Sequence, residues 1–228
     1  IVSTFENGKL TVSKGWLDFE CEFDIDFDFS DVTTLYLGDN VALGVASATG
    51  GAVYSMNFEN LEEFEVSDTN PNYTVQDGVL YNKDMTELIA YPCGKKDETF
   101  VIPDTVKSGF CCVENPYIKH LEIGKDYIGC YSYRNGGSKL IDDPDLLNDT
   151  GLNRNKLLNL EDIAVSEGNR FYTSLGGVLF NKKVTKLLVY PENKQDITYE
   201  VPETVQVINK YAFSHSDIGA SETWADSE

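Results

Sequence analysis

The feature that most constrains this chain is an internal repeat. Residues 60–106 align without a gap on residues 159–205, an offset of 99 positions, and 23 of the 47 aligned positions are identical. Chance does not produce an ungapped match of this quality. Self-similarity at a fixed spacing is typical of architectures in which each unit buries its apolar face against its neighbours. We therefore expect a row of similar supersecondary units.

The shared segments predict β-structure. In the first copy two short apolar runs, residues 79–81 and 88–91, flank a polar stretch that begins at Asn82. Asparagine can adopt the left-handed conformation that a tight turn requires, so these runs predict a β-hairpin in each copy. Pro92 and Pro191 are expected to end the second strand, because proline cannot donate a hydrogen bond to a ladder.

Pairs of apolar residues that are two positions apart predict further strands, because such side chains lie on one strand face. These pairs are Leu35/Leu37, Phe64/Val66, Phe100/Ile102, Leu121/Ile123, Ile163/Val165 and Tyr199/Val201. The aromatic positions shared by the two copies predict core residues in preference to an exposed binding strip: Tyr73/Tyr172, Tyr81/Phe180, Tyr91/Tyr190 and Phe100/Tyr199. Positions that differ are a better guide to a distinctive surface, as at Cys93/Glu192, Glu98/Ile197 and Val101/Glu200.

The segments GVLYNKDMTELIAYP, FVIPDTV, IKHLEIG and VINKYAF resemble the BspA-like leucine-rich repeats, irregular solenoids on the surface of anaerobic bacteria and some protozoa. The resemblance covers residues 32 to 218. It implies a mainly β fold, a β-rich leucine-rich-repeat right-handed solenoid with inserted β-hairpins and a few short helices. It also implies a role in adhesion or binding, and it supplies no catalytic residues.

Two regions are expected on this basis. Residues 1–31 form an N-terminal amphipathic strand or cap, and residues 32–228 form the solenoid, with the two repeat copies at 60–106 and 159–205. An insertion at 134–157 interrupts the repeat, and Asp143 before Pro144 predicts a short helix in it. This insertion is either a solvated connector or a loop that contacts a partner.

An acidic ladder lies near the N-terminus. From Leu17 to Phe29 every odd position is apolar, and every even position from 18 to 28 is acidic, which predicts a strand with one buried and one solvated face. We interpret it as a cover for the open end of the row of repeats. The alternative is a calcium site at Asp24, Asp26 and Asp28, although the glycine and glutamate that an EF-hand loop requires are absent.

The net charge of −20 makes nucleic acid and anionic lipid poor partners, because both are bound through clustered basic residues. No apolar run approaches the ~18 residues of a membrane span, so no direct membrane insertion is expected. Acids at both ends of the chain, including Glu222, Asp226 and Glu228, oppose end-to-end association and favour a monomer. The tripeptides that begin at Asn72 and Asn148 match the glycosylation sequon, a weak pattern.

Catalytic signals are sparse. The chain has two histidines, His120 and His215, and lacks the nucleophile-elbow, phosphate-loop, dinucleotide and zinc-protease motifs. The five cysteines include no C-x-x-C pair, so no zinc site is predicted. Alignment places Cys112 where the other units have Ala212 and Ser132, which indicates a small packed residue. A dyad of Cys112 with His120 is the reactive alternative.

These observations predict a protein that is not an enzyme, has no cofactor and mediates adhesion or binding. The expected partner is a protein or glycan ligand, with host extracellular matrix among the candidates. Because the chain opens at Ile1 without methionine, we expect a signal peptide to have been removed and the location to be extracellular or at the cell surface. The alternatives are a scaffold that presents another domain of a larger surface protein, or a polysaccharide- or peptidoglycan-active hydrolase.

Overall fold

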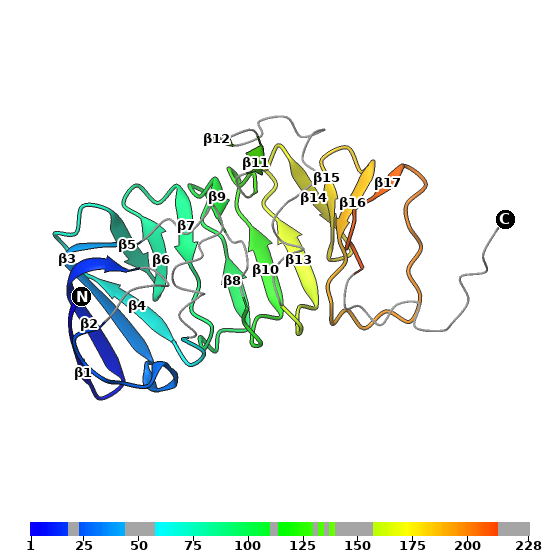
Figure 1. Cartoon of the computed structure of the whole chain (residues 1–228). Helices are drawn as coiled ribbons and strands as arrows, with labels where there is room; N and C mark the ends of the chain where they lie inside the picture. The colour runs from blue at the N-terminus through cyan, green and yellow to red at the C-terminus, as the bar shows by residue number, and fades with distance from the viewer. Residues whose placement is uncertain are drawn as a thin grey trace.

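The computed structural model describes residues 1–17, 23–43, 58–109, 114–129, 132–134, 137–139 and 157–213. Within them the protein is mainly β, as expected, with strands β1 to β17 and one short 3-10 helix, η1 (Phe29–Asp31). The strands follow one another along an elongated molecule, from the N-terminal sheet to β17 (Figure 1). The short helix predicted after Asp143 lies outside the described residues.

The N-terminal sheet has the order β1-β2-β3-β4. Strand β1 (Val2–Glu6) pairs antiparallel with β2 (Lys9–Leu17), and β2, β3 (Thr34–Leu43) and β4 (Glu63–Val66) are parallel. Leu10, Leu35 and Phe64 stand in register, and each is at most 1% exposed. One face of this sheet therefore covers an apolar core.

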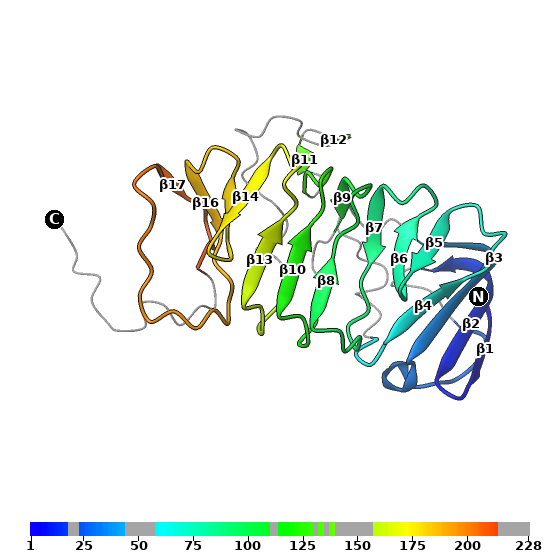
Figure 2. The same ribbon diagram turned by 180° about the vertical axis from the view of Figure 1, so that it is seen from behind.

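A second parallel sheet has the order β13-β10-β8. It consists of β8 (Thr99–Val101), β10 (His120–Ile123) and β13 (Asp162–Val165), which lie side by side in both views (Figures 1 and 2). Phe100, Leu121 and Ile163 are buried in register, so the spacing of apolar pairs identified these strands correctly.

Each repeat copy contains a three-stranded antiparallel meander, to which a short strand just after the copy adds in parallel. The first comprises β5 (Tyr73–Gln76), β6 (Val79–Asn82), β7 (Glu87–Ala90) and β9 (Ser108–Gly109). The second comprises β14 (Tyr172–Leu175), β15 (Val178–Asn181), β16 (Lys186–Val189) and β17 (Val207–Ile208). The predicted hairpins, β6–β7 and β15–β16, are confirmed. Strands β11 (Ser132–Arg134) and β12 (Gly137–Lys139) form a separate antiparallel pair.

The turn of these hairpins differs from the prediction. The residues with positive φ are Met85 (55°) and Val184 (54°) rather than the asparagines. Asn82 acts instead through its side chain, whose Oδ1 accepts the backbone N–H groups of Thr86 at 2.8 Å and Glu87 at 2.9 Å. Asn181 repeats this pattern, which explains why asparagine occupies both positions.

The strand predicted at Tyr199/Val201 is absent. Its counterpart in the first copy, β8, pairs with β10, and no described strand pairs with residues 198–201. An isolated strand leaves its backbone groups without ladder partners, so alternating side chains alone do not make a strand.

The single strand predicted from Leu17 to Phe29 is also wrong in its second half. Strand β2 ends at Leu17, and residues 23–28 have no ladder partner. The alternation nevertheless survives as burial, because Phe23, Ile25, Phe27 and Phe29 are half-buried against the N-terminal core while the intervening aspartates are exposed. The segment therefore attaches through side-chain packing, including a stacked pair of Phe5 and Phe27 with centroids 5.6 Å apart. Its role as a cap stays a prediction.

Successive units are tied together by three buried asparagines that sequence reasoning missed: Asn70, Asn115 and Asn169. In each, the side-chain amide donates to carbonyls of the preceding unit and Oδ1 accepts two backbone N–H groups of its own unit. Asn169, for example, donates to the carbonyls of Gly124 at 2.8 Å and Tyr127 at 3.1 Å. Buried polar groups are tolerated when they are fully bonded in this way.

The shared aromatic residues are core residues, as predicted. Tyr81, Tyr91, Tyr172, Phe180 and Tyr190 are at most 2% exposed. Phe100 is 6% exposed, and Tyr73 and Tyr199 pack at the margins of the cores. Cys112, His215, most of the 134–157 insertion and the acids after residue 213, all considered in the sequence, lie outside the described residues.

Candidate binding surface

The three aspartates of the calcium alternative do not act together. Asp24 Oδ1 accepts hydrogen bonds from the backbone N–H of Ser3 at 3.0 Å and from its hydroxyl at 2.7 Å. Asp28 instead accepts from the N–H and hydroxyl of Ser30 at the start of η1. These bonds hold the pKa of both carboxyls below their usual range, with the hydroxyl bond as the largest cause. Asp26 is exposed.

Within the described residues, no three His, Cys, Asp or Glu side chains are grouped so that they could hold a metal ion. Calcium binding by Asp24, Asp26 and Asp28 stays an untested alternative. The reactive dyad is likewise untested, because Cys112 lies outside the described part.

His120 faces away from the core, as its position beside Leu121 predicts. Its Nδ1 lies 2.5 Å from Asp162 Oδ2 on the neighbouring strand, and both side chains are 42% exposed. The pair joins β10 to β13 on the solvent side of the sheet. It is a cross-strand contact of a kind that sheets commonly carry.

The exposed side of the β8–β10–β13 sheet forms what we call the outer face. The ladder register aligns its side chains in two rows, Thr99–His120–Asp162 and Val101–Glu122–Ala164. The exposed side of the N-terminal sheet continues this pattern with Lys9, Thr34, Tyr36, Glu63 and Glu65. There Lys9 Nζ lies 2.5 Å from Glu65 Oε2 and 5.1 Å from the centroid of the Tyr36 ring.

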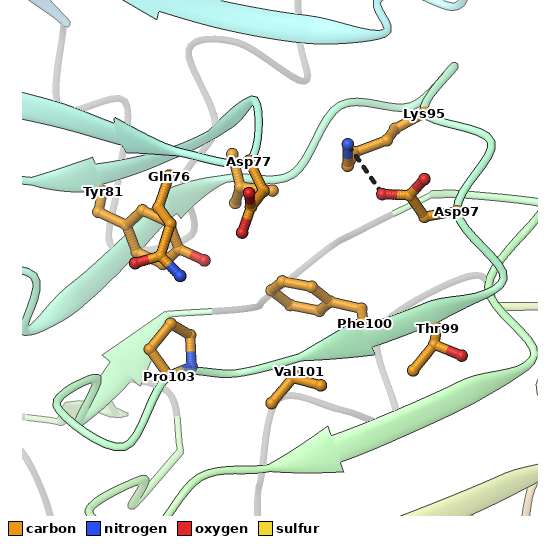
Figure 3. Close-up of a pocket in the computed structure, with 10 residues that line it drawn as sticks. Gln76, Asp77, Tyr81, Lys95, Asp97, Thr99, Phe100, Val101 and Pro103 are labelled. Atoms are coloured by element: carbon orange, nitrogen blue, oxygen red, sulfur yellow. Dashed lines mark ion pairs between the residues drawn. The ribbon is translucent and has the colours of Figure 1, made fainter.

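A cavity of about 270 Å³ lies between the β5–β6 turn and β8, and we call it the slot. Gln76, Asp77, Val79 and Tyr81 form its hairpin side. Thr99, Phe100, Val101 and Pro103 form the opposite side, with Lys95 and Asp97 at one end (Figure 3). Lys95 Nζ pairs with Asp97 Oδ2 at 2.9 Å.

The chain builds the slot by inserting a hairpin turn between two parallel sheets. Asp77 and Gly78 have φ values of 53° and 75°, which suit a two-residue hairpin turn. The carbonyl of Gly78 accepts the N–H of Phe64 at 2.9 Å, so the turn covers the edge of β4. Strand β8 lies on the far side of the turn and cannot pair with β4.

The lining of the slot carries a net negative charge. Burial raises the pKa of Tyr81, and the charge of Asp77 raises it further. Burial likewise raises the pKa of Tyr91, to which Asp97 and Tyr81 add. Both phenols therefore remain neutral, and the lining carries the charges of two carboxylates against that of one ammonium.

The sequence did not single out the slot, although two signals for it were present. One is the Asp77-Gly78 dipeptide, the strongest short-range hairpin signal. The other is Val101, named above as a position where the two copies differ. Cys93, another such position, is half-buried, and burial raises the pKa of its thiol to about 11, with Glu114 and Glu59 adding to the shift. Its neutral thiol is therefore no candidate nucleophile at neutral pH.

No protein-family model matches this chain, and neither does any curated protein. Solved structures that it resembles include a leucine-rich repeat protein from Eubacterium ventriosum, at 19% identity and a TM-score of 0.36, which aligns over 85% of this chain and 61% of that one. The pneumococcal vaccine antigen PcpA matches at 17% identity and a TM-score of 0.38, over 82% and 55%. A leucine-rich cell surface protein from Faecalibacterium prausnitzii matches at 14% identity and a TM-score of 0.41, over 92% and 64%.

These neighbours are bacterial proteins, of which two are described as leucine-rich, one as a cell surface protein and one as a vaccine antigen. The chain spans less than two thirds of the length of each. In the described part of the chain, no helix has the length and apolar character needed to cross a membrane.

Proposed function

We propose that this chain is a leucine-rich-repeat right-handed solenoid that serves as a non-enzymatic binding module of a secreted or cell-surface protein. Its partner is a host protein or glycan, extracellular matrix included, and the module acts as a monomer. The internal repeat, the parallel ladders and the resemblance of the repeat segments to BspA-like sequences support the proposal.

The main support for the proposal is the comparison of which residues the two copies share and which residues differ. The apolar residues shared by both copies are mostly buried, as at Leu80/Leu179 and Tyr91/Tyr190, and they serve stacking. Differences occur on the outer side, where Glu65 corresponds to Ala164 and Val101 to Glu200. A stack needs its shared core, whereas a distinctive surface needs variation.

The outer face is suited to recognition through charge and hydrogen bonds. Its carboxylates are Glu122 on β10 and Asp162 on β13, and Glu63 on β4 of the N-terminal sheet adds a third on the same side. Such a surface favours partners that present basic or hydroxyl-rich groups, and it accelerates the encounter with basic partners at low salt.

The test is binding of the purified chain to an array of extracellular-matrix proteins and glycans. We expect retention on one or more members, weakened at least about threefold by Glu122→Lys or Asp162→Lys. The matched control is Asp84→Lys, which makes the same charge change on the exposed β6–β7 turn. Absence of binding to every member, or equal loss with the control variant, would contradict the proposal.

A further inference from the structure

One edge of strand β8 is hydrogen-bonded to β10, and the other edge has no partner strand among the described residues. The register with β10 directs the backbone groups of residues 98, 100 and 102 toward that strand, as in the bonds from His120 N–H to the Glu98 carbonyl and from Ile102 N–H to the Glu122 carbonyl, each 2.9 Å long. In a strand, successive residues direct their N–H and C=O groups to opposite edges. The backbone groups of Thr99 and Val101 therefore point away from β10.

Those groups face the slot. Thr99 and Val101 both line it, and no described residue pairs with their backbone N–H or C=O groups. The edge of β4 on the other side of the gap is covered by the Gly78 carbonyl, but the edge of β8 is not. An open strand edge is a template for a further strand.

The dimensions suit a short segment of extended chain. The strand β8 has three residues, about 10 Å of edge at a rise of ~3.3 Å per residue. A volume of about 270 Å³ is near the lower end of what encloses a small ligand, so it holds part of a chain and leaves the rest on the surface. Both sides of the opening are lined by exposed residues, Gln76 and Asp77 on one side and Thr99 and Val101 on the other.

The charges select the kind of side chain that would enter. Lys95 already pairs with Asp97, which leaves the carboxylate of Asp77 on the hairpin side, in a molecule with a net charge of −20. A lysine or arginine side chain would complement this lining. A sugar ring is less well served, because the aromatic residues of the slot, Tyr81 and Phe100, are 2% and 6% exposed and offer little ring surface for stacking.

We propose that the slot binds an extended peptide segment that carries a basic side chain and adds to the open edge of β8 as a short strand. The backbone groups of Thr99 and Val101 supply the ladder bonds, and Asp77 receives the basic side chain. This mode of recognition takes its affinity from main-chain hydrogen bonds and its preference from the pocket beside them. The site goes beyond the proposed function: it shares Thr99 and Val101 with the outer face but uses their backbone groups, and it does not require the side chain of Asp162 to bind.

The second copy provides a natural comparison. Lys194 and Asp196 repeat the ion pair at 3.3 Å, but Gly176 replaces Asp77 and Glu200 replaces Val101. Residues 198–200 are not a strand, so no ordered edge is presented there. We therefore assign peptide binding to the first copy alone.

The probe is a set of blocked pentapeptides of alternating threonine and valine, with one lysine or arginine at each position in turn, titrated into the ¹⁵N-labelled chain and followed by NMR. At about 1 mM peptide we expect saturable shifts at Thr99 and Val101 for at least one register. The same peptide with N-methylated backbone amides should bind at least about tenfold more weakly, because it cannot complete the ladder. Replacing its basic residue by glutamate should weaken binding about threefold or more.

The matched variants are Val101→Pro and Glu200→Pro. Proline at Val101 removes an N–H that points into the slot and leaves the β10 ladder intact, so it should abolish binding. Proline at the equivalent Glu200 should not change it. Asp77→Asn, at an exposed turn residue with φ of 53° that asparagine also tolerates, should weaken binding about threefold without altering the fold.

Several results would overturn the proposal. They are the absence of shifts with every pentapeptide, equal binding of the N-methylated peptide, and binding that survives Val101→Pro. If Val101→Pro fails to fold, unchanged affinity in Asp77→Asn decides against it. Binding of maltohexaose to the slot in preference to the peptides would identify a glycan site instead. Asp162→Lys, on β13 two strands away from β8, should leave peptide binding intact, which separates this test from that of the outer face.

Discussion

The two repeat copies have nearly the same hairpins, but they differ in the segment that follows the hairpin. Strands β5, β6 and β7 correspond to β14, β15 and β16, and the Phe64 N–H to Gly78 carbonyl bond recurs between Ile163 and Gly177, at 2.9 Å in both. After the hairpin the copies diverge. Strand β8 forms in the first copy, and its counterpart at 198–201 is extended chain without a ladder.

The difference indicates that β8 forms because it pairs with a strand of the adjacent unit. The first copy is followed by residues 114–129, whose strand β10 pairs with β8 and whose Asn115 donates to the carbonyls of Pro92, Cys93 and Lys95. No described residues play these parts for the second copy. Its apolar side chains show the consequence, because Ile197 is 95% exposed and Val207 is 48% exposed, whereas Ser108, which pairs with β7 as Val207 pairs with β16, is 1% exposed. The hairpins are determined by the local sequence, whereas the parallel pairing of β8 depends on the adjacent unit.

The largest effect is expected at the asparagines that join units in both copies. Replacing Asn70 or Asn169 by alanine removes four hydrogen bonds and leaves buried carbonyl and N–H groups without partners. Each variant should lose about 3 kcal/mol of unfolding free energy, measured by urea denaturation. Asn72→Ala, at an exposed position two residues from Asn70, is the control and should change it by less than about 0.5 kcal/mol. Losses below about 1 kcal/mol in both asparagine variants would show that these residues do not join the units.

The next effect concerns the turns that the copies share. Gly78 and Gly177 have φ values of 75° and 82°, and an added Cβ would lie 2.9 Å from Glu63 Cβ and 2.8 Å from Asp162 Cβ, respectively. Alanine at either position should cost about 2 kcal/mol of stability in the same assay. Gly176→Asp copies the residue found at the equivalent position of the first copy and has open space around it, so it should cost less than about 1 kcal/mol. Equal losses in all three would contradict the close approach of turn and strand.

A smaller effect is expected in the reactivity of Cys93, whose position in the second copy is taken by Glu192. Burial, together with Glu114 and Glu59, raises the pKa of this thiol to about 11. Its alkylation by iodoacetamide at pH 8 should therefore be at least about tenfold slower than that of a free cysteine peptide, and it should accelerate as the pH rises toward 11. Peptide-resolved mass spectrometry of the labelled chain measures this rate. A rate equal to that of the free peptide would mean that the following unit does not cover Cys93.

The smallest effect is a pH dependence in the first copy that the second should lack. Burial raises the pKa of Glu87, so the folded state holds this proton more tightly than the unfolded state does. The ionised side chain therefore destabilises the fold at neutral pH, and its contribution improves as the pH falls through the raised pKa. Glu87→Gln should increase stability at pH 7 by less than about 0.5 kcal/mol and have a diminishing effect toward pH 4. Thermal unfolding at both pH values, with Lys186→Gln as the control in the second copy, measures the difference, and a benefit that grows toward pH 4 would contradict it.

The sequence predicted the elements whose signals are local. The apolar pairs located β3, β4, β8, β10 and β13, and the two copies located the hairpins. The sequence-based prediction failed where a strand depends on its pairing partner. Tyr199 and Val201 alternate as well as Phe100 and Ile102 do, but they have no neighbouring strand among the described residues. The strand predicted for the acidic segment at residues 17–29 was wrong in its second half for a related reason. Its alternation records burial against the N-terminal core, which side-chain packing achieves without a ladder.

The candidate sites were less accessible to sequence reasoning. The outer face could be inferred from residues that alternate with the core positions, such as His120 beside Leu121. The slot could not, because it depends on a turn at Asp77 lying next to a strand edge more than 20 residues later in the chain. A property of this kind arises only from the tertiary arrangement. Even so, the difference between Val101 and Glu200 marked the edge where the slot lies.

The open edge of β8 distinguishes the first copy from the second, and amide hydrogen exchange resolved by NMR measures that edge residue by residue. The N–H groups of Phe100 and Ile102 point toward β10 and should exchange at least about a hundredfold more slowly than those of Thr99 and Val101, which point into the slot. Saturation with the best-binding pentapeptide should then slow exchange at Thr99 and Val101 alone. Uniform protection of all four amides in the free chain would show that the edge is already paired, and it would contradict both the slot and the contrast between the two copies.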